Sequence, residues 1–220
     1  MTELLDWDDA YQENGMFGGL PPWSIGRPQP EIADLIRQGA FRSDVLDAGC
    51  GRGDTSLVLA TLGYTVVGID RSATAIAEAA QESSKRRLHN ATFVSADITT
   101  LTGYEGRFST IVDSALFHAL PVARRDDYLA SMRRAAAPGA ALHMLTFTQD
   151  AFPEDPGYPI PNVVTRSELG DAVSRHWTVD DIRPAFIHAH APQTRSGQTF
   201  ALDVDGREKL PAFLLSAHRL

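Results

Sequence analysis

The chain contains very little cysteine and no long run of basic residues. Cys50 is the only cysteine among 220 residues, so no disulfide can form within the chain. Asp and Glu number 28 against 20 Lys and Arg, which gives a formal net charge of −8. This balance argues against binding to nucleic acid or to an anionic membrane surface, because both need a basic face.

Long apolar runs are also missing. No stretch approaches the roughly 18 residues that a membrane span needs, and the N-terminus carries acids where a signal peptide would carry bases. Together with the single cysteine, these absences predict a cytoplasmic protein with no membrane partner. A length of 220 residues with 43% hydrophobic content suits one domain. We predict a single domain over residues 1–220, with an N-terminal arm over 1–30, as a monomer or homodimer.

Three alternating glycines join an apolar segment to a helical one. Residues 45–56 read Val-Leu-Asp-Ala-Gly-Cys-Gly-Arg-Gly-Asp-Thr-Ser. Residues 43–47 are typical of a buried strand, and 54–56 can cap a helix over 57–62. Gly49, Gly51 and Gly53 can adopt positive φ and let the backbone approach a ligand where any Cβ would collide. The pattern predicts a turn that holds a charged, nucleoside-bearing ligand.

The acids around this turn indicate the kind of nucleoside. A second strand predicted at 65–69 ends at Asp70, about 20 residues past the glycines, where an acid can accept hydrogen bonds from ribose hydroxyls. A dinucleotide-binding turn would read G-x-G-x-x-G and bind pyrophosphate. Here the turn reads G-x-G-x-G between Asp47 and Asp54, whose carboxylates repel phosphate and favour a cation.

This pattern resembles the first motif of class I S-adenosylmethionine-dependent methyltransferases, whose methyl donor carries a sulfonium, an ammonium and a ribose. The resemblance extends from about residue 30 to the C-terminus. It implies an α/β fold, namely a three-layer, doubly wound, mostly parallel seven-stranded sheet with an antiparallel last strand. Further strands are expected at 90–98, 106–113 and 142–147, then an antiparallel pair at 177–189 and 212–220. Helices are expected at 73–88 and 125–136, with a Pro138-Gly139 turn before the fifth strand.

The resemblance also implies S-adenosylmethionine as cofactor, with S-adenosylhomocysteine as product. Asp97, after the third strand, would contact the adenine amino group, and Ile98 would flank the ring. Asp113, in the fourth strand, would bond the methionine ammonium or shape the following loop. The full set of expected cofactor contacts is Trp23, Arg27, Asp47, Gly49, Gly51, Gly53, Asp70, Arg71, Asp97, Ile98 and Asp113.

The N-terminal arm is rich in proline and aromatic residues. Residues 21–30 read Pro-Pro-Trp-Ser-Ile-Gly-Arg-Pro-Gln-Pro, and the four prolines fix an extended backbone that presents Trp23 rigidly. This arm resembles small-molecule methyltransferases of the thiopurine and tellurite-resistance type, and more narrowly the heterocyclic toxin or benzoquinone methyltransferases, associated with O-methylation of hydroxyquinolones and related phenols. With Trp7, a lid and substrate site would include Tyr11, Phe17, Trp23, Phe117, His118, Phe152 and Tyr158. The alternative is that each ring only pins the arm to the sheet.

Methyl transfer is an in-line displacement, so the protein aligns the nucleophile, excludes water and removes a proton where one must leave. His118 is the first candidate catalytic residue because it follows the fourth strand and histidine titrates near neutral pH. Asp113 is the second candidate. His118 bonding only its neighbouring backbone is the structural alternative, and an acceptor that arrives ionised would need a donor rather than a base. Asp113, Gln149 and Asp150 match metal-dependent enzymes of this fold only partly, so we predict no metal.

The sequence thus predicts an enzyme that O-methylates a phenolic or hydroxyquinolone-type hydroxyl of a small aromatic molecule, in detoxification or secondary metabolism. A Pro-Pro-aromatic after the fourth strand, the mark of methylation at amide or adenine nitrogen, is replaced by Asp-Ser-Ala-Leu at 113–116. Two alternatives stay open. One is S-, N- or C-methylation of another small molecule, such as a thiol, tellurite or a quinone, and the other is a catalytically silent S-adenosylmethionine-binding protein.

Overall fold

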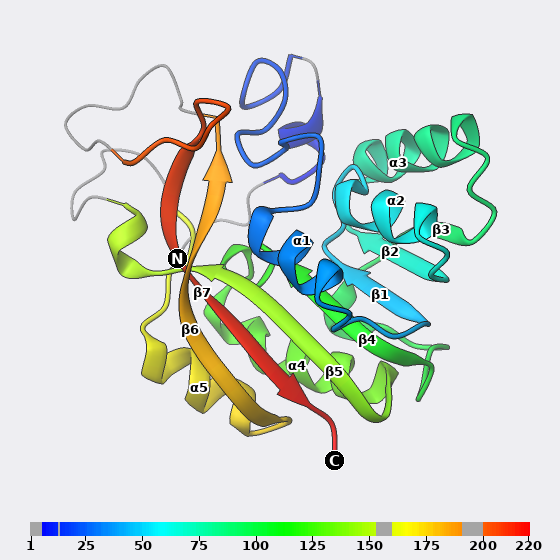
Figure 1. Cartoon of the computed structure of the whole chain (residues 1–220), viewed down its shortest axis with the longest axis vertical. Helices are drawn as coiled ribbons and strands as arrows, with labels where there is room; N and C mark the ends of the chain where they lie inside the picture. The colour runs from blue at the N-terminus through cyan, green and yellow to red at the C-terminus, as the bar shows by residue number, and fades with distance from the viewer. Residues whose placement is uncertain (1–5, 13, 153–159, 191–199) are drawn as a thin grey trace.

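One seven-stranded sheet forms the centre of the molecule (Figure 1). This computed structural model describes residues 6–12, 14–152, 160–190 and 200–220. The strand order is β3-β2-β1-β4-β5-β7-β6, and the strands are β1 (Val45–Ala48), β2 (Val66–Asp70), β3 (Ala91–Ser95), β4 (Phe108–Ser114), β5 (Ala136–Phe147), β6 (Thr178–Ala189) and β7 (Glu208–His218). Strands β1 to β5 pair in parallel, whereas β7 pairs antiparallel with β5 and β6. The predicted mostly parallel sheet is therefore confirmed.

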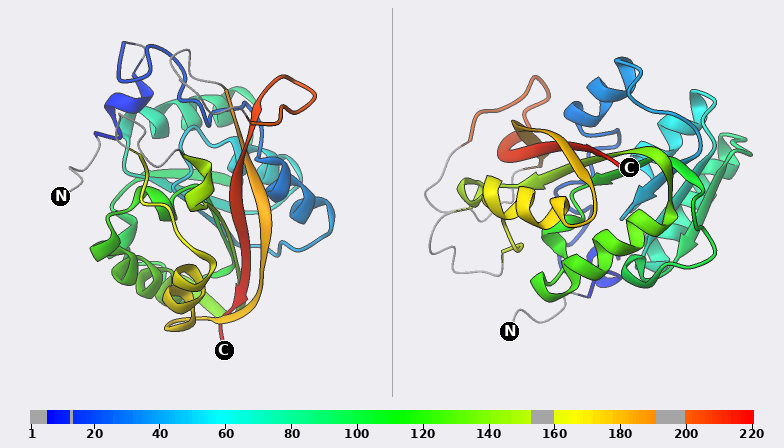
Figure 2. Two further views of the ribbon diagram at one scale, coloured as in Figure 1. Left: turned by 90° about the vertical axis from the view of Figure 1, so that its left-hand side faces the viewer. Right: turned by 90° about the horizontal axis from the view of Figure 1, so that it is seen from below.

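Helices cover both faces of this sheet, as the views in Figure 2 show. They are α1 (Pro30–Arg37), α2 (Asp54–Thr61), α3 (Ala73–Lys85), α4 (Arg125–Ala135) and α5 (Arg166–Ser174). One buried apolar cluster joins α1 and α2 to the sheet, and a second joins α4 and α5 to it. Neighbouring strand residues contribute to opposite clusters, Val45 to the first and Leu46 to the second, because side chains alternate along a strand. The predicted three layers are confirmed.

The direction of the chain changes at β1. From β1 the chain builds β2 and β3 on one side, then returns to build β4 and β5 on the other. In open α/β sheets a ligand binds outside the carboxyl ends of the strands at such a switch point. The fold therefore directs attention to the loops that follow β1 and β4.

Several predicted boundaries were wrong, among them the start of the last strand, which begins at Glu208 instead of residue 212. Strand β5 begins at Ala136, directly after α4, so Pro138 and Gly139 lie within the strand rather than before it. The pairing register of β4 with β5 shifts between Phe108 and Thr110, and Gly139 has φ +70°, which lets the strand start early with a local irregularity. Helix α2 begins at Asp54 with Gly53 at its N-cap, so residues 54–56 form its first turn instead of a cap. Helix α3 ends at Lys85, before the expected residue 88, because Arg87 adopts φ +58°.

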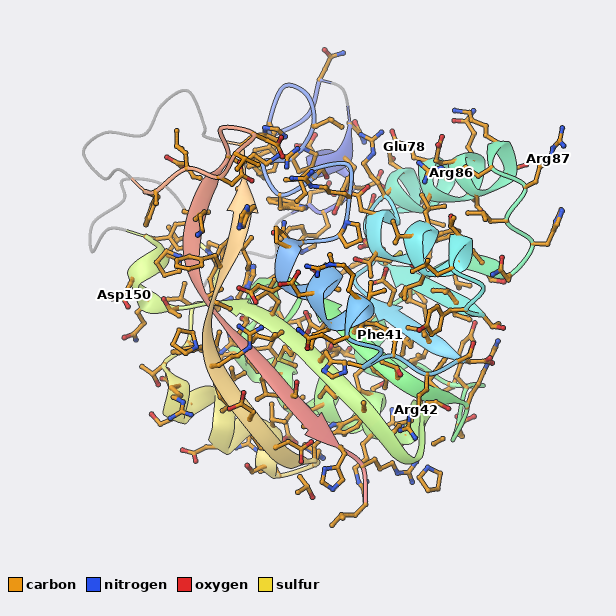
Figure 3. The ribbon with its side chains drawn as sticks, in the orientation of Figure 1. Phe41, Arg42, Glu78, Arg86, Arg87 and Asp150 are labelled. Atoms are coloured by element: carbon orange, nitrogen blue, oxygen red, sulfur yellow. The ribbon has the colours of Figure 1, made fainter. Side chains whose placement is uncertain are left out.

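Basic side chains gather at the outer end of α3, away from the switch point. Figure 3 labels Arg86 and Arg87 on this part of the molecule, with Arg87 at its outer edge. Arg86 Nε lies 2.8 Å from Glu82 Oε1, and Lys85 Nζ lies 3.6 Å from Glu82 Oε2. This small basic group is thus partly neutralised by its own helix. Within the described part of the chain, no helix is long and apolar enough to cross a membrane.

Candidate active site

The glycine loop between β1 and α2 takes a conformation that few other residues can adopt. Gly49, Gly51 and Gly53 have φ of +69°, +51° and +80°. A Cβ at Gly49 would lie 2.8 Å from the Leu116 side chain, and one at Gly51 would lie 2.7 Å from the Tyr11 hydroxyl. Only glycine avoids both the strain and the clash. The loop therefore lies close to the N-terminal arm on one side and to the loop after β4 on the other.

Asp70 connects the tip of β2 to this loop. Its carboxylate accepts hydrogen bonds from Gly51 N at 2.8 Å and Ser72 N at 2.9 Å, and burial raises its pKa. Asp47 plays a different part, because it is buried and accepts from the amide and hydroxyl of Ser56 at 3.1 and 2.6 Å. Burial raises the pKa of Asp47 to about 6. Asp47 thus fixes the start of α2, while Asp70 stands at the strand tip.

The segment after β3 adds a second carboxylate on the same edge of the sheet. Asp97 is exposed and uses Oδ1 to accept hydrogen bonds from the amide and hydroxyl of Thr99 at 2.9 and 2.6 Å. Burial acts to raise the pKa of Asp97, but Thr99 and the Arg124 guanidinium hold it below its ordinary value. Ile98 is buried beside it, and Arg71 is exposed. Asp97 is therefore ionised at neutral pH.

Asp113 organises the loop after β4. It is fully buried, Oδ1 accepts from Leu116 N at 2.8 Å and Phe117 N at 3.3 Å, and Oδ2 accepts from the Tyr128 hydroxyl at 2.8 Å. Burial raises the pKa of Asp113 to about 7. Of the roles considered from the sequence, this geometry matches shaping the loop, since both oxygens are engaged in the protein interior.

Phe117 lies in the core, not at the substrate site where its position after the fourth strand predicted it. Its side chain is fully buried, and the Arg125 guanidinium lies 4.6 Å above its ring. Its other side approaches Tyr128, with ring centroids 6.4 Å apart. Phe117 therefore supports the loop from below instead of offering a surface to a substrate.

His118, in the short helix η3 (Phe117–Ala119), is held against β5. Nδ1 accepts a hydrogen bond from Phe147 N at 3.2 Å and lies 3.2 Å from Thr146 Oγ1. Burial, with the positive charge of Arg125, lowers the pKa of His118 to about 3. Because Nδ1 accepts, the neutral imidazole carries its proton on Nε2. At neutral pH His118 is thus a donor through Nε2.

Asn162 joins a distant segment to the His118 loop, and the sequence analysis missed it. Asn162 N donates to His118 O at 2.8 Å, and Nδ2 donates to Leu120 O at 3.0 Å. The Asn162 carbonyl accepts from Arg125. The only signal in the sequence was its position directly after the loop-rich stretch that ends at Pro161.

The expected aromatic set divides into two groups. Trp23 lies at the centre of the first group, with ring centroids 6.2, 6.5 and 5.2 Å from Trp7, Tyr11 and Phe17. The second group follows β5, where Phe147 lies 4.4 Å from His118 and 5.1 Å from Phe152 between ring centroids. Tyr158 lies outside the described residues. The four arm rings pack on one another around Trp23, and the Tyr11 hydroxyl lies against Gly51 of the glycine loop. The role of these rings as a lid stays a prediction.

The described part of the arm, residues 6–12 and 14–29, drawn in blue in Figure 1, is anchored at both ends. Near its start, Asp8 accepts from Ser72 Oγ at 2.8 Å and Thr74 N at 2.9 Å at the beginning of α3. At its end, the Gln29 side chain accepts from His188 N at 2.7 Å and donates to His188 O at 3.0 Å on β6. Arg27, expected at the cofactor, forms an ion pair with Asp205. The arm therefore runs from α3 to β6 past the glycine loop.

These residues fit a nucleoside that carries positive charge. The glycine loop brings its main chain close to Leu116 and Tyr11, and the carboxylates of Asp70 and Asp97 stand on the same edge of the sheet. For a metal the fit is poor, because no three His, Cys, Asp or Glu side chains among the described residues are grouped to hold an ion. Figure 3 places Asp150 at the outer edge of the molecule, whereas Asp113 is buried in β4.

The sheet order, the glycine turn after β1 and the acid at the tip of β2 define a class I methyltransferase architecture. A family model described as a methyltransferase domain matches residues 45–139. With a full-length relative at 50% identity, the chain belongs to the S-adenosylmethionine-dependent methyltransferases. That relative is the 2-heptyl-1-hydroxyquinolin-4(1H)-one methyltransferase of Mycobacteroides abscessus, aligned over 228 residues and over 100% of both chains.

Solved structures agree with this assignment. A structure from a study of the conversion of a disulfide bond into a thioacetal group during echinomycin biosynthesis has a TM-score of 0.83 at 32% identity, covering 97% of this chain and 90% of that one. The 1,6-didemethyltoxoflavin-N1-methyltransferase of Burkholderia thailandensis, solved with 1,6-didemethyltoxoflavin and S-adenosylhomocysteine, shares the fold at TM-score 0.61 and 22% identity. It covers 86% of this chain and 76% of that one. The chain is an enzyme that uses S-adenosylmethionine as methyl donor.

Proposed function

We propose that this enzyme transfers a methyl group from S-adenosylmethionine to the hydroxyl oxygen of a small hydroxyquinolone-type aromatic molecule. The observation that carries the proposal is the 50% identity to the hydroxyquinolone methyltransferase over the full length of both chains. The aligned region includes the proline-rich arm and the aromatic groups on both sides of the glycine loop. Methylation would cap an acidic hydroxyl, which suits a role in detoxification.

Within this proposal, the edge formed by the ends of β1, β2 and β3 holds the cofactor. When bound, S-adenosylmethionine supplies a methyl carbon that its sulfonium sulfur activates. We assign Asp70 to the ribose hydroxyls, Asp97 to the adenine amino group and Ile98 to the adenine face. Asp47 and Asp113 support this edge from the interior, because both carboxylates are buried, Asp47 against Ser56 and Asp113 against the loop after β4 and Tyr128.

The acceptor then lies beside the loop after β4, at the switch point of the sheet. We assign it the His118 edge and the second aromatic group, Phe147 and Phe152. The first aromatic group, centred on Trp23, excludes water above the glycine loop. Both groups suit a flat, apolar molecule, since aromatic rings bind one another by offset or edge contacts.

The test is a labelled-methyl assay with four acceptors and S-adenosylmethionine. The acceptors are 2-heptyl-1-hydroxyquinolin-4(1H)-one, the same quinolone without the N-hydroxyl, a simple phenol and an aryl thiol. We expect an O-methyl product from the hydroxyquinolone, identified by mass spectrometry. Transfer to the thiol alone would move the acceptor from oxygen to sulfur. S-adenosylhomocysteine binding without transfer to any acceptor would support a silent binding protein instead.

A further inference from the structure

The contacts of His118 indicate a role that is neither that of a base nor only structural. We propose that His118 meets the acceptor as a neutral hydrogen-bond donor, that Thr146 is the side chain that positions it, and that the enzyme takes acceptors that bind already ionised. The proposal rests on the proposed function, because it concerns the oxygen that receives the methyl group.

The first argument is the direction of the imidazole proton. Phe147 N is a main-chain donor in β5, and it lies 3.2 Å from Nδ1 in the buried interior. A proton on Nδ1 would leave that amide without its acceptor, which costs about 1–3 kcal/mol in a buried site. The proton therefore stays on Nε2. An imidazole in this form donates from Nε2 and has no lone pair there with which to remove a proton.

The second argument concerns the charged groups around the ring. From β4, Asp113 has both oxygens engaged by Leu116, Phe117 and Tyr128, the last from α4. From α4, Arg125 presents a positive charge that opposes protonation of His118. Burial lowers the pKa of Arg125, and the nearby carboxylates of Glu168 and Asp113 act to raise it. Among the described residues packed against His118, the geometry thus offers a cation and a neutral donor, a combination that favours a bound anion.

The role of Thr146 follows from its position. Its side chain is fully buried, and Oγ1 lies 3.2 Å from His118 Nδ1, beside the Phe147 amide. The hydroxyl and the amide together hold the ring from the β5 side. Valine has nearly the same shape as threonine but lacks the hydroxyl, so Thr146→Val removes this contact with little change in packing. Thr146→Ser keeps the hydroxyl and serves as the conservative variant.

In the proposed step the acceptor has already lost its proton to bulk water. A lone pair of the acceptor oxygen forms the new C–O bond, while the electron pair of the breaking C–S bond stays on sulfur. The sulfonium becomes a neutral thioether, and the oxyanion becomes a neutral ether. No proton moves in the step, so no base is needed, and the His118 Nε2–H only holds the oxygen in line.

The first test is the pH dependence of kcat/KM for wild-type enzyme with a series of acceptors of different acidity. Ring-substituted 1-hydroxyquinolin-4(1H)-ones and phenols serve, from an acidic nitrophenol to phenol itself near pKa 10. We expect the midpoint of each profile to follow the pKa of the acceptor. A midpoint that stays fixed for all acceptors would reveal a base in the protein and overturn this proposal alone. Absence of O-methyl product from every acceptor would overturn the proposed function with it.

The second test separates a donor from a base. Gln carries an N–H donor but cannot accept a proton, so His118→Gln should keep kcat/KM within about tenfold of wild type. His118→Ala should lose roughly 100-fold or more, the effect of deleting one preorganised donor. Equal losses in both variants, with unchanged S-adenosylhomocysteine affinity and melting temperature, would contradict a donor role. The pH series in the wild type decides the matter if either variant unfolds.

The positioning role of Thr146 is tested separately, by measuring kcat and S-adenosylhomocysteine affinity in Thr146 variants. We expect Thr146→Val to lower kcat about fivefold, the value of one neutral hydrogen bond near 1 kcal/mol, without changing S-adenosylhomocysteine affinity. Thr146→Ser should recover most of that loss. If Thr146→Val leaves kcat unchanged, Thr146 does not position His118.

Discussion

The proposed cofactor side and the proposed acceptor side of the site are assembled in different ways. The cofactor side, residues 45–98, is one continuous stretch of alternating strands and helices that carries the glycine loop, Asp70 and Asp97. The acceptor side joins segments that are far apart in the chain, since Asn162 bonds the His118 loop across about 40 positions. The arm is also tied down at long range, because Gln29 bonds His188 across 159 positions. The cofactor side depends on local geometry, whereas the acceptor side exists only once the whole sheet has formed.

The largest effect should come from the cofactor side. Asp70→Ala should weaken S-adenosylhomocysteine binding by roughly 1.5–3 kcal/mol, about tenfold to 150-fold, because charge-assisted hydrogen bonds are lost. Isothermal titration calorimetry measures this, with exposed Asp171→Ala on α5 as the matched control. Unchanged affinity would remove Asp70 from the ribose site and would place the cofactor side elsewhere.

The anchor of the arm on β6 should matter for stability. Gln29→Ala leaves the buried amide and carbonyl of His188 without their partners, which should lower the free energy of unfolding by about 1–3 kcal/mol. Exposed Gln38→Ala, at the end of α1, should change it by less than about 0.5 kcal/mol. Urea denaturation compares the two. Equal effects would mean that the arm is not held through this contact.

His118 and Asp113 should have opposite effects on how the free energy of unfolding changes in acid. The pKa of His118 lies near 3, below its ordinary 6.5, so the stability linked to it is complete above pH 6.5 and is lost as the pH falls toward 3. His118→Gln should remove up to about 1.4 kcal/mol per pH unit from the slope of unfolding free energy between pH 4 and 6.

Asp113 changes the pH dependence of stability in the opposite direction from His118. Its pKa, raised to about 7, gives stability that is present below pH 4 and lost as the pH rises through 7. Asp113→Asn should therefore steepen the loss of stability in acid. Denaturation curves at pH 4.5, 5.5 and 6.5 measure both slopes, and curves that stay parallel to wild type would show that neither residue titrates as described.

The smallest effect, and the most selective one, concerns Asn162. Asn162→Ala deletes the hydrogen bond from Nδ2 to Leu120 O and should cost about 0.5–1.5 kcal/mol of stability. Turnover should fall while S-adenosylhomocysteine affinity stays near wild type. Asn162→Asp should be worse, because a carboxylate would then face the Leu120 carbonyl. If either variant loses cofactor affinity in proportion to turnover, the two sides of the site are not separable.

The fold could be predicted from sequence because each strand is an apolar run between turn signals. The buried β1 and the tip of β2 at Asp70 lie where local patterns put them. The start of β5 could not be predicted, since Pro138 and Gly139 are typical of a turn. They lie in the irregularity between the β4 partners Ala136 and Ala141, and Gly139 N donates to Arg219 O at 2.9 Å. At this position, contacts with the rest of the sheet outweigh the local preference of Pro138 and Gly139 for a turn.

The site was predictable to the extent that its residues are adjacent in sequence. The glycine loop and the position of Asp70 follow from spacing, and Asp97 follows from the resemblance to the family. The state of His118 does not, because it depends on Thr146 and Phe147, which reach it only through the pairing of β4 with β5. Asp113 could not be placed either, since its partner Tyr128 comes from α4.

Gln29 also affects whether the edge of the sheet can pair with another chain. Strand β6 is the last strand of the sheet, and such an edge invites pairing with a strand of another chain. The Gln29 amide forms with His188 the donor and acceptor bonds that a neighbouring strand would form, and Pro22 O accepts from His190 N at 2.8 Å. The segment that borders the active site thus also seals part of the edge of β6 against edge-to-edge aggregation.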